Sequence, residues 1–168
     1  MDYDAAAEYW IQKDKNSARM PKEELLVAME QFIKAHNTCA LATGAGDFVR
    51  CTPIEYNYVD GAFYLLSEGG LKFRALRDNK NVCLAIFESY SGFGNLKGMQ
   101  VSGKADMVEP YSDEYNRLLE IKKIPLEAIK KLPQQLHLVK ITPTVIDYLN
   151  SDFKKDGFDS RQQLQFGD

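Results

Sequence analysis

Apolar and polar residues alternate along much of the chain between residues 38 and 148, and this pattern is typical of half-buried β-strands. Six segments carry it, namely 38–43, 48–58, 62–67, 82–88, 97–108 and 135–148. Asp60 and Gly61 separate the second segment from the third, and they predict a hairpin because glycine accepts a positive φ without steric cost. Short strands joined by turns favour an antiparallel barrel or sandwich over a parallel sheet.

Helical periodicity predicts helices at 4–16, 21–35, 70–79 and 113–123, the last with a further turn or two toward residue 131. Segment 21–35 has the clearest packing face, because Leu25, Met29 and Phe32 recur at helical spacing. The end of the chain is polar, with scattered aromatic residues. With 168 residues in all, we expect a single domain over 1–149 and a C-terminal tail over 150–168.

The composition is that of an ordinary globular protein, with 45% apolar residues, 27% charged residues and a net charge of −3. A negative net charge gives no general attraction for nucleic acid or an anionic membrane, so an anion site has to be a local cluster. The chain has no run of about eighteen apolar residues, and its acidic start lacks a signal-peptide core. We therefore expect a cytoplasmic protein with no nucleic-acid or membrane partner.

Three cysteines, Cys39, Cys51 and Cys83, lie in strand-like segments, and none belongs to a Cys-x-x-Cys pair. Their odd number argues against a disulfide framework and predicts buried free thiols in a reducing compartment. His36 and His137 are isolated in the sequence, and each is more typical of a structural role than of a catalytic one. We expect no metal site.

The stretch from Arg50 to Lys72 contains the strongest candidates for a ligand-binding site. A cation stands at each end, and Ser67 and the Gly69-Gly70 pair lie between them, which suits a phosphate group. Pro53 cannot donate a backbone hydrogen bond, so its strand is expected to be irregularly paired on one side and able to offer backbone groups to a ligand. The alternatives are that Arg50 and Lys72 are solvated surface cations and that Ser67 is an ordinary turn residue.

This stretch resembles the flavin-binding part of the pyridoxamine 5′-phosphate oxidase-like split barrels, and the resemblance covers about residues 37–110. In that family an arginine opens the strand that lies along the flavin, and a lysine after the next strand holds the ribityl phosphate. The resemblance implies a mainly β protein with flanking helices, built as a six-stranded antiparallel split β-barrel that binds FMN as a homodimer. The cofactor-binding residues that it implies are Arg50, Cys51, Thr52, Pro53, Leu65, Leu66, Ser67, Leu71, Lys72, Gly98 and Gln100. The family's fifth strand, which holds the last two, often belongs to the opposite subunit.

The true vitamin B6 oxidases carry a C-terminal Arg-x-Glu-x-Trp-like signature, whereas the only tryptophan here is Trp10. The chain is more similar to the small flavoproteins of the superfamily, such as the general-stress and nitroimidazole-resistance types. We expect an FMN-dependent oxidoreductase that acts on a small molecule at a homodimer interface, with a pocket formed by loop 89–95 and the tail. The alternative is a non-catalytic flavin- or haem-binding, storage or haem-degrading protein, with His36 or His137 as axial ligand. No catalytic residue is assigned.

Overall fold

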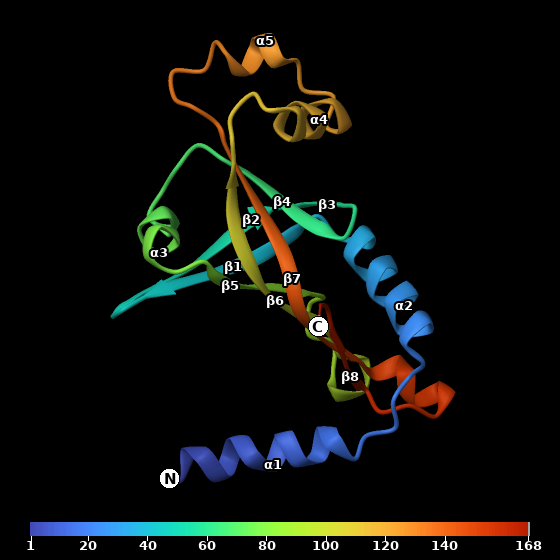
Figure 1. Ribbon diagram of the computed structural model, residues 1–168. Helices are drawn as coiled ribbons and strands as arrows, with labels where there is room; N and C mark the ends of the chain where they lie inside the picture. The colour runs from blue at the N-terminus through green and yellow to red at the C-terminus, as the bar shows by residue number, and fades with distance from the viewer. Residues whose placement is uncertain (168) are drawn as a thin grey trace.

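The computed structural model describes residues 1–167, and its centre is one curled antiparallel sheet (Figure 1). The strands are β1 (Thr38–Ala45), β2 (Phe48–Glu55), β3 (Asn57–Val59), β4 (Ala62–Ser67), β5 (Asn81–Phe87), β6 (Lys97–Val108), β7 (His137–Asn150) and β8 (Arg161–Gln165). Their order is β2-β1-β5-β6-β7-β4-β3, and β8 pairs with β7. All pairings are antiparallel, as the sequence predicts.

Helices and short 3-10 turns surround this sheet. They are α1 (Tyr3–Lys15), α2 (Lys22–Ala35), α3 (Lys72–Asp78), η1 (Phe93–Asn95), α4 (Asp113–Ile121), α5 (Leu126–Ile129) and η2 (Ser151–Asp156). The apolar face of α2 packs into the main core, where Leu25, Met29 and Phe32 are buried with the inward-facing strand residues. A second cluster lies beneath α4 and α5, around Tyr115 and Leu138. The predicted helices are confirmed, and the region after residue 112 forms two of them.

The predicted strand 48–58 is divided, and this division lets the sheet curl. β2 pairs with β1, whereas β3 pairs with β4 at the other end of the strand order. Between them, Tyr56 turns inward with 3% exposure, and its hydroxyl donates to the Ile33 carbonyl at 2.6 Å. β2 and β3 follow one another in the chain but lie at opposite ends of the strand order. The two edges of the sheet are therefore joined by the chain at Tyr56, and not by backbone hydrogen bonds between β2 and β3.

The long pairing of β6 with β7 contains an irregularity at Gly103, which lies opposite Pro143. A Cβ atom at Gly103 would lie 2.6 Å from the Thr142 carbonyl oxygen and 2.9 Å from Ile141 Cγ2. Real Cβ atoms do not approach backbone so closely, so only glycine fits here without displacing β7. Close backbone approach and a bulge are the two features that a glycine within a strand indicates.

The segment predicted as a tail extends the sheet, because it contains η2 and β8, and β8 pairs with the second half of β7. Phe153 and Leu164 are buried in the main core. Gln162 is 1% exposed, and its amide donates to the Ala18 carbonyl at 3.0 Å. The sheet has eight strands instead of the predicted six, because β8 is added and because the predicted strand 48–58 is divided at Tyr56. Asp168, the last residue of the predicted tail, lies outside the described residues.

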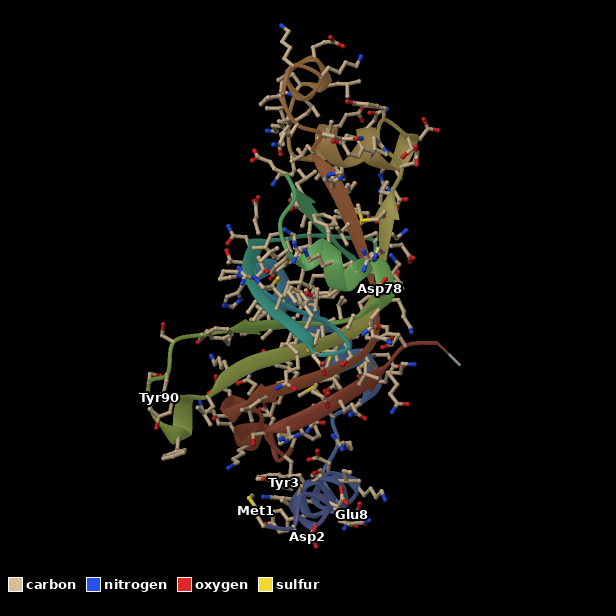
Figure 2. All side chains as sticks on the ribbon, turned by 90° about the vertical axis from the view of Figure 1, so that its left-hand side faces the viewer. Met1, Asp2, Tyr3, Glu8, Asp78 and Tyr90 are labelled. Carbon is tan, nitrogen blue, oxygen red and sulfur yellow. The ribbon has the colours of Figure 1, made fainter. Side chains whose placement is uncertain are left out.

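Helix α1 lies at one end of the molecule, away from the sheet in both views (Figures 1 and 2). Its N-cap is Asp2, whose side chain accepts a hydrogen bond from the Ala5 amide at 2.9 Å. None of its residues is buried, so this helix is not part of the core. An ion pair at 3.2 Å between Asp14 and Arg161 of β8 fastens its C-terminal end.

The expectation of three buried thiols is wrong for one cysteine. Cys39 points into the core, and burial raises the pKa of its thiol to about 12. Cys83 is half-buried, and desolvation raises its pKa as well. Cys51 is exposed, because it lies on the outward face of the edge strand β2.

Candidate functional site

An open cleft of about 620 Å³ separates β2 from the loop that joins β4 to α3. Its lining residues are Thr52, Pro53, Ile54, Leu66, Ser67, Glu68, Gly69, Gly70, Lys72 and Leu136. Three chain segments therefore meet here, since Leu136 directly precedes β7. The cleft therefore lies between the two ends of the stretch 50–72, which the sequence predicts to bind a phosphate group.

One wall of the cleft is an edge strand. β2 pairs with β1 over its whole length without a register shift, and it is the last strand in the order on that side. Pro53 lies opposite Ala40 of β1. A proline is tolerated in a strand whose other side has no partner, because the missing N–H would face that side. The irregular pairing predicted on one side is therefore not seen: within the described residues β2 forms a regular ladder with β1 and has no strand on its other side, and that free edge borders the cleft.

Lys72 lies at the opposite wall and is 7% exposed. Its Nζ donates to the Gly69 carbonyl, and it lies 5.1 Å from the centre of the Phe73 ring. Within residues 1–167 no carboxylate pairs with it. Burial lowers the pKa of this amine. A buried ammonium group without a counter-charge is unfavourable, and a bound anion would offset that penalty.

The loop before Lys72 holds its donors close together. Ser67 is buried, its Oγ donates to the Gly69 carbonyl at 3.0 Å, and it accepts from the Gly69 amide at 3.2 Å. Gly69 and Gly70 have φ angles of 140° and 105°, which side chains rarely permit. Two donors, Ser67 Oγ and Lys72 Nζ, thus converge on a single carbonyl oxygen. An anionic oxygen placed nearby could accept from both.

Five of the predicted cofactor residues line this cleft: Thr52, Pro53, Leu66, Ser67 and Lys72. Four others lie beside it. Arg50 is exposed on the same face of β2 as Thr52, two residues away, whereas Cys51 points to the opposite face. Leu65 is fully buried in the core, so that its backbone alone can reach a ligand, and Leu71 is 43% exposed within the lining loop.

Gly98 and Gln100 do not reach this cleft within one chain. Across the sheet, Pro53 aligns with Ala40, Ala40 with Ala85, and Ala85 with Gln100. Three strand spacings of about 4.8 Å put Gln100 roughly 14 Å from Pro53 along the sheet. Gly98 and Gln100 instead line a second, smaller cavity of about 240 Å³ over β5, β6, β7 and β8.

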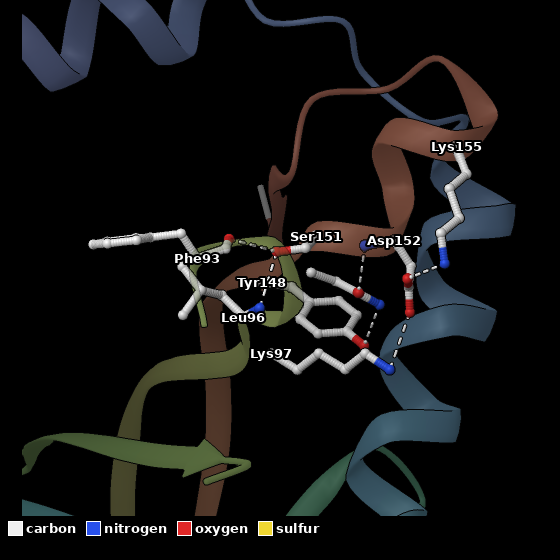
Figure 3. A network of polar contacts seen from close by, with 8 residues as sticks. Phe93, Leu96, Lys97, Tyr148, Ser151, Asp152 and Lys155 are labelled. Atoms are coloured by element: carbon white, nitrogen blue, oxygen red, sulfur yellow. Dashed lines mark hydrogen bonds and ion pairs between the residues drawn. The ribbon is translucent and has the colours of Figure 1, made fainter. Parts of the chain in front are cut away.

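The loop 89–95 and the predicted tail do come together, in a polar network that joins the start of β6 to η2 (Figure 3). Ser151 accepts from the Leu96 amide at 2.9 Å, and its own amide donates to the Leu96 carbonyl at 2.9 Å. Lys97 pairs with Asp152 at 3.0 Å, and this ion pair raises the pKa of the amine. The network holds the tail against the loop, but neither segment lines the cleft at Lys72, and their predicted part in a substrate pocket stays a prediction.

Leu136 lines the cleft and His137 is the next residue along the chain, and sequence reasoning assigned neither to the phosphate unit. His137 lies opposite Ser67 in the pairing of β4 with β7, and its ring is 5.2 Å from that of Phe73. Leu136 directly precedes β7 and His137 is its first residue, far along the chain from residues 50–72. No local signal connects them to residues 50–72, because only the strand order brings β7 beside β4.

In the part of the chain that the structure describes, no group of three or more His, Cys, Asp or Glu side chains is arranged to hold a metal ion. None of the described helices is long and apolar enough to cross a membrane.

A family model described as pyridoxamine 5′-phosphate oxidase matches residues 25–150, which is most of the chain. The chain belongs to the pyridoxamine 5′-phosphate oxidase family. The resemblance predicted from residues 37–110 is therefore confirmed, and the curled antiparallel sheet is the split barrel of this family. Helix α1 and strand β8 lie outside the matched range. No curated protein matches the chain significantly.

Solved structures share the fold at low sequence identity. ChuZ from Campylobacter jejuni is 17% identical with a TM-score of 0.66, and the alignment covers 98% of this chain and 69% of ChuZ. A FAD-binding protein from Mesorhizobium loti is 16% identical with a TM-score of 0.58, over 72% of this chain and 89% of that protein. HutZ from Vibrio cholerae, a haem storage protein, is 18% identical with a TM-score of 0.57, over 74% and 91%. The solved structures that share this fold thus include both a FAD-binding protein and a haem storage protein.

Proposed function

We propose that the chain binds FMN in the cleft between β2 and α3 and acts as an FMN-dependent oxidoreductase on a small molecule at a homodimer interface. The observation that carries the proposal is Lys72, a buried amine without a carboxylate partner among the described residues. The phosphate of FMN is close to dianionic at neutral pH and would supply the missing counter-charge.

The residues present fit an FMN phosphate. Lys72 and Ser67 are both donors, and Gly69 and Gly70 keep the loop free of side chains where an anion would approach. Arg50 lies outside the lining but on the same face of β2, so its exposed guanidinium can approach a phosphate with a change of rotamer. The free edge of β2 at Cys51 and Pro53 offers backbone groups to the edge of a flat ring.

FMN, when bound, supplies the redox chemistry by exchanging a hydride or single electrons. The chain's own part is to hold and orient it. Lys72 and Ser67 fix the phosphate end, and β2 aligns the ring through its backbone. Leu66, Ile54 and Leu136 contribute apolar surface to the same cleft and limit the access of water.

Two observations support the homodimer in this proposal. Gly98 and Gln100 lie too far from the cleft to complete it within one chain, and a partner could bring its own copies there. The outward face of β2, β1, β5 and β6 also carries small side chains that suit close approach of two sheets. These are Cys51, Pro53, Ala40, Ala42, Cys83, Ala85 and Ser102.

Ala42→Arg is expected to convert the dimer into monomers, because a long charged side chain would stand between the two small-residue faces. Ala42 is half-buried and lies between Cys51 and Cys83 in the register. Light scattering after size-exclusion chromatography measures the molar mass. Ala128→Arg, on exposed α5, is the matched control and should keep the mass of two chains. A wild-type protein with the mass of one chain would contradict the homodimer.

The haem alternative is favoured by the relationship to HutZ, and it requires an axial ligand. His36 lies at the end of α2, where its Nδ1 bonds the Phe32 carbonyl at 2.8 Å. His137 lies closer to the cleft, opposite Ser67. A Soret band on addition of haem that disappears in His137→Ala, but persists in His36→Ala, would support a haem site at this cleft.

The deciding experiment is a visible spectrum of the purified protein, followed by identification of the released cofactor. Bound flavin, or tight reconstitution of a colourless protein with FMN, supports the proposal. A protein that cannot be reconstituted with FMN contradicts it.

A further inference from the structure

Strand β8 has a partner strand on one side only. It pairs with β7 in a regular antiparallel register from Arg161 to Gln165, and among the described residues no strand lies along its other edge. An edge strand is a template for pairing with another extended chain, so proteins usually protect it with lysine, proline or a bulge. β8 has none of these, because its sequence is Arg-Gln-Gln-Leu-Gln and its register does not shift. This edge is therefore open to pairing.

The backbone groups of β8 alternate between its two edges, as in any strand. The Phe166 amide donates to a carbonyl of β7 at 2.9 Å, whereas the Arg161 carbonyl accepts from the Arg19 guanidinium at 3.3 Å and so points away from β7. Gln163 and Gln165 alternate in step with Arg161. Within residues 1–167 the backbone N–H and C=O groups of these two glutamines have no hydrogen-bond partner on that side. The free edge thus presents donors and acceptors at the spacing of a β-ladder.

A groove of about 330 Å³ follows this edge, and we call it the β8 groove. Residues 162–165 of β8 line one side, and the chain that leads into α2 lines the other with Arg19, Met20, Lys22 and Leu25. Leu25 and Leu164 are buried, and Met20 is half-buried, so the groove includes apolar surface. An extended chain paired with β8 could place one of its alternate side chains on this surface.

The β8 groove carries two cations that have no acidic partner. Arg19 and Lys22 are exposed, and in the described part of the chain neither pairs with a carboxylate. Arg19 donates to the backbone carbonyls of Asp14 and Arg161. No acidic side chain of the described residues lines the groove. An incoming chain with a carboxylate would therefore be attracted, and a basic one would be repelled.

The β8 groove lies almost wholly outside the part of the chain that matches the family. The match covers residues 25–150, whereas β8 and residues 19–22 lie beyond it. The groove also shares no lining residue with the cleft at Lys72. An inference from this groove therefore does not depend on FMN.

We propose that the β8 groove binds an extended, acidic peptide segment of a partner protein, which adds a strand to the sheet beside β8. Backbone hydrogen bonds to Gln163 and Gln165 provide the affinity. The apolar surface at Met20 and Leu25 selects a side chain of the peptide. Arg19 and Lys22 select a carboxylate in the same segment.

The test uses the full chain labelled with ¹⁵N and the peptide acetyl-Glu-Val-Thr-Leu-Thr-Val-Glu-amide. Its β-branched residues favour an extended chain, and it has an acid at both ends for either direction of pairing. We expect the peptide to shift the amide signals of Gln163 and Gln165 and to slow their hydrogen exchange. The same peptide with glutamine in place of both glutamates should bind about two- to fivefold more weakly, the usual contribution of an exposed ion pair.

Lys22→Ala should weaken the acidic peptide by the same factor and leave the affinity of the glutamine peptide unchanged. Lys34→Ala is the matched control, because Lys34 is an exposed lysine in the last turn of the same helix. It should bind both peptides as the wild type does.

Two N-methylated forms of the acidic peptide test backbone pairing without any change to the protein. Methyl groups on the alternate amides that face β8 remove the ladder hydrogen bonds, so one set should abolish binding and the other set should retain it. No binding of the acidic peptide, equal binding of the two methylated forms, or equal affinity of the acidic and glutamine peptides would overturn the inference. Slow exchange of the Gln163 and Gln165 amides in the free protein would also overturn it, since a second copy of the chain would then already cover the edge.

Discussion

Lys72→Met is expected to raise the dissociation constant for FMN by about 10- to 150-fold, because a hydrogen bond to a charged group is worth about 1.5–3 kcal/mol. Methionine keeps a long unbranched side chain in the buried space and removes only the charge and the donors. Fluorescence titration of the apoprotein with FMN measures the change. Arg77→Ala is the matched control at the other end of α3, where the side chain is 77% exposed and paired with Asp78.

The same substitution is expected to leave the free energy of unfolding of the apoprotein unchanged or to increase it. Burial lowers the pKa of Lys72, so the folded state disfavours the charged amine. At a pH below this lowered pKa, the buried charge therefore reduces the free energy of unfolding of the wild type. The free energy of unfolding rises as the pH increases from the lowered pKa toward about 10.4, the pKa of lysine in the unfolded chain. The advantage of Lys72→Met should disappear at high pH.

These two results together separate a functional lysine from a structural one. Urea denaturation at neutral and alkaline pH gives the stability difference, and the titration gives the affinity. A variant that binds FMN as tightly as the wild type would contradict the phosphate role of Lys72. A variant that is strongly destabilised would instead indicate that Lys72 holds the Gly69 loop for folding.

Gly103→Ala is expected to destabilise the fold by about 1–3 kcal/mol, the usual effect of inserting a methyl group into a well-packed interior. The added Cβ would meet the Thr142 carbonyl oxygen at 2.6 Å, and that atom belongs to the backbone of β7. For a domain of this size each kcal/mol lowers Tm by about 2–4 °C. Thermal unfolding followed by circular dichroism measures the change.

Gly98→Ala is the matched control for this substitution, because it makes the same chemical change on the same strand. Its Cβ would lie 3.4 Å from Phe87 Cβ, which is a contact that a small side-chain movement relieves. Its Tm should stay close to that of the wild type. Equal loss of Tm in both variants would mean that strand propensity, rather than the close approach of β6 and β7, explains the loss.

The positions of the strands and helices could be predicted because their signals are local. Alternation and the Asp60-Gly61 turn each involve residues within a few positions of one another. The strand boundary at Tyr56 could not be predicted in this way. Its inward turn depends on the carbonyl of Ile33 in α2, which the local pattern does not contain.

In the candidate site, too, the features with local signals could be predicted and those that depend on packing could not. Ser67, Gly69, Gly70 and Lys72 are neighbours in the sequence, so the unit that suits a phosphate is visible in the chain alone. The burial of Lys72 without a counter-charge is not, because it depends on how β4, α3 and β2 pack together. The exposed position of Cys51 likewise follows from β2 being an edge strand, although its alternating pattern resembles that of a buried one.

The sequence by itself determined the order of the elements, the antiparallel hairpins and the cationic, glycine-rich stretch from Arg50 to Lys72, since hydrophobic period and turn chemistry act over short distances. The tertiary structure alone decided three further features: the closure of the sheet through Tyr56, the addition of β8 from the supposed tail, and the separation of Gln100 from the Lys72 cleft. Each depends on which strands become neighbours, and that is a property of the packed sheet rather than of any one segment.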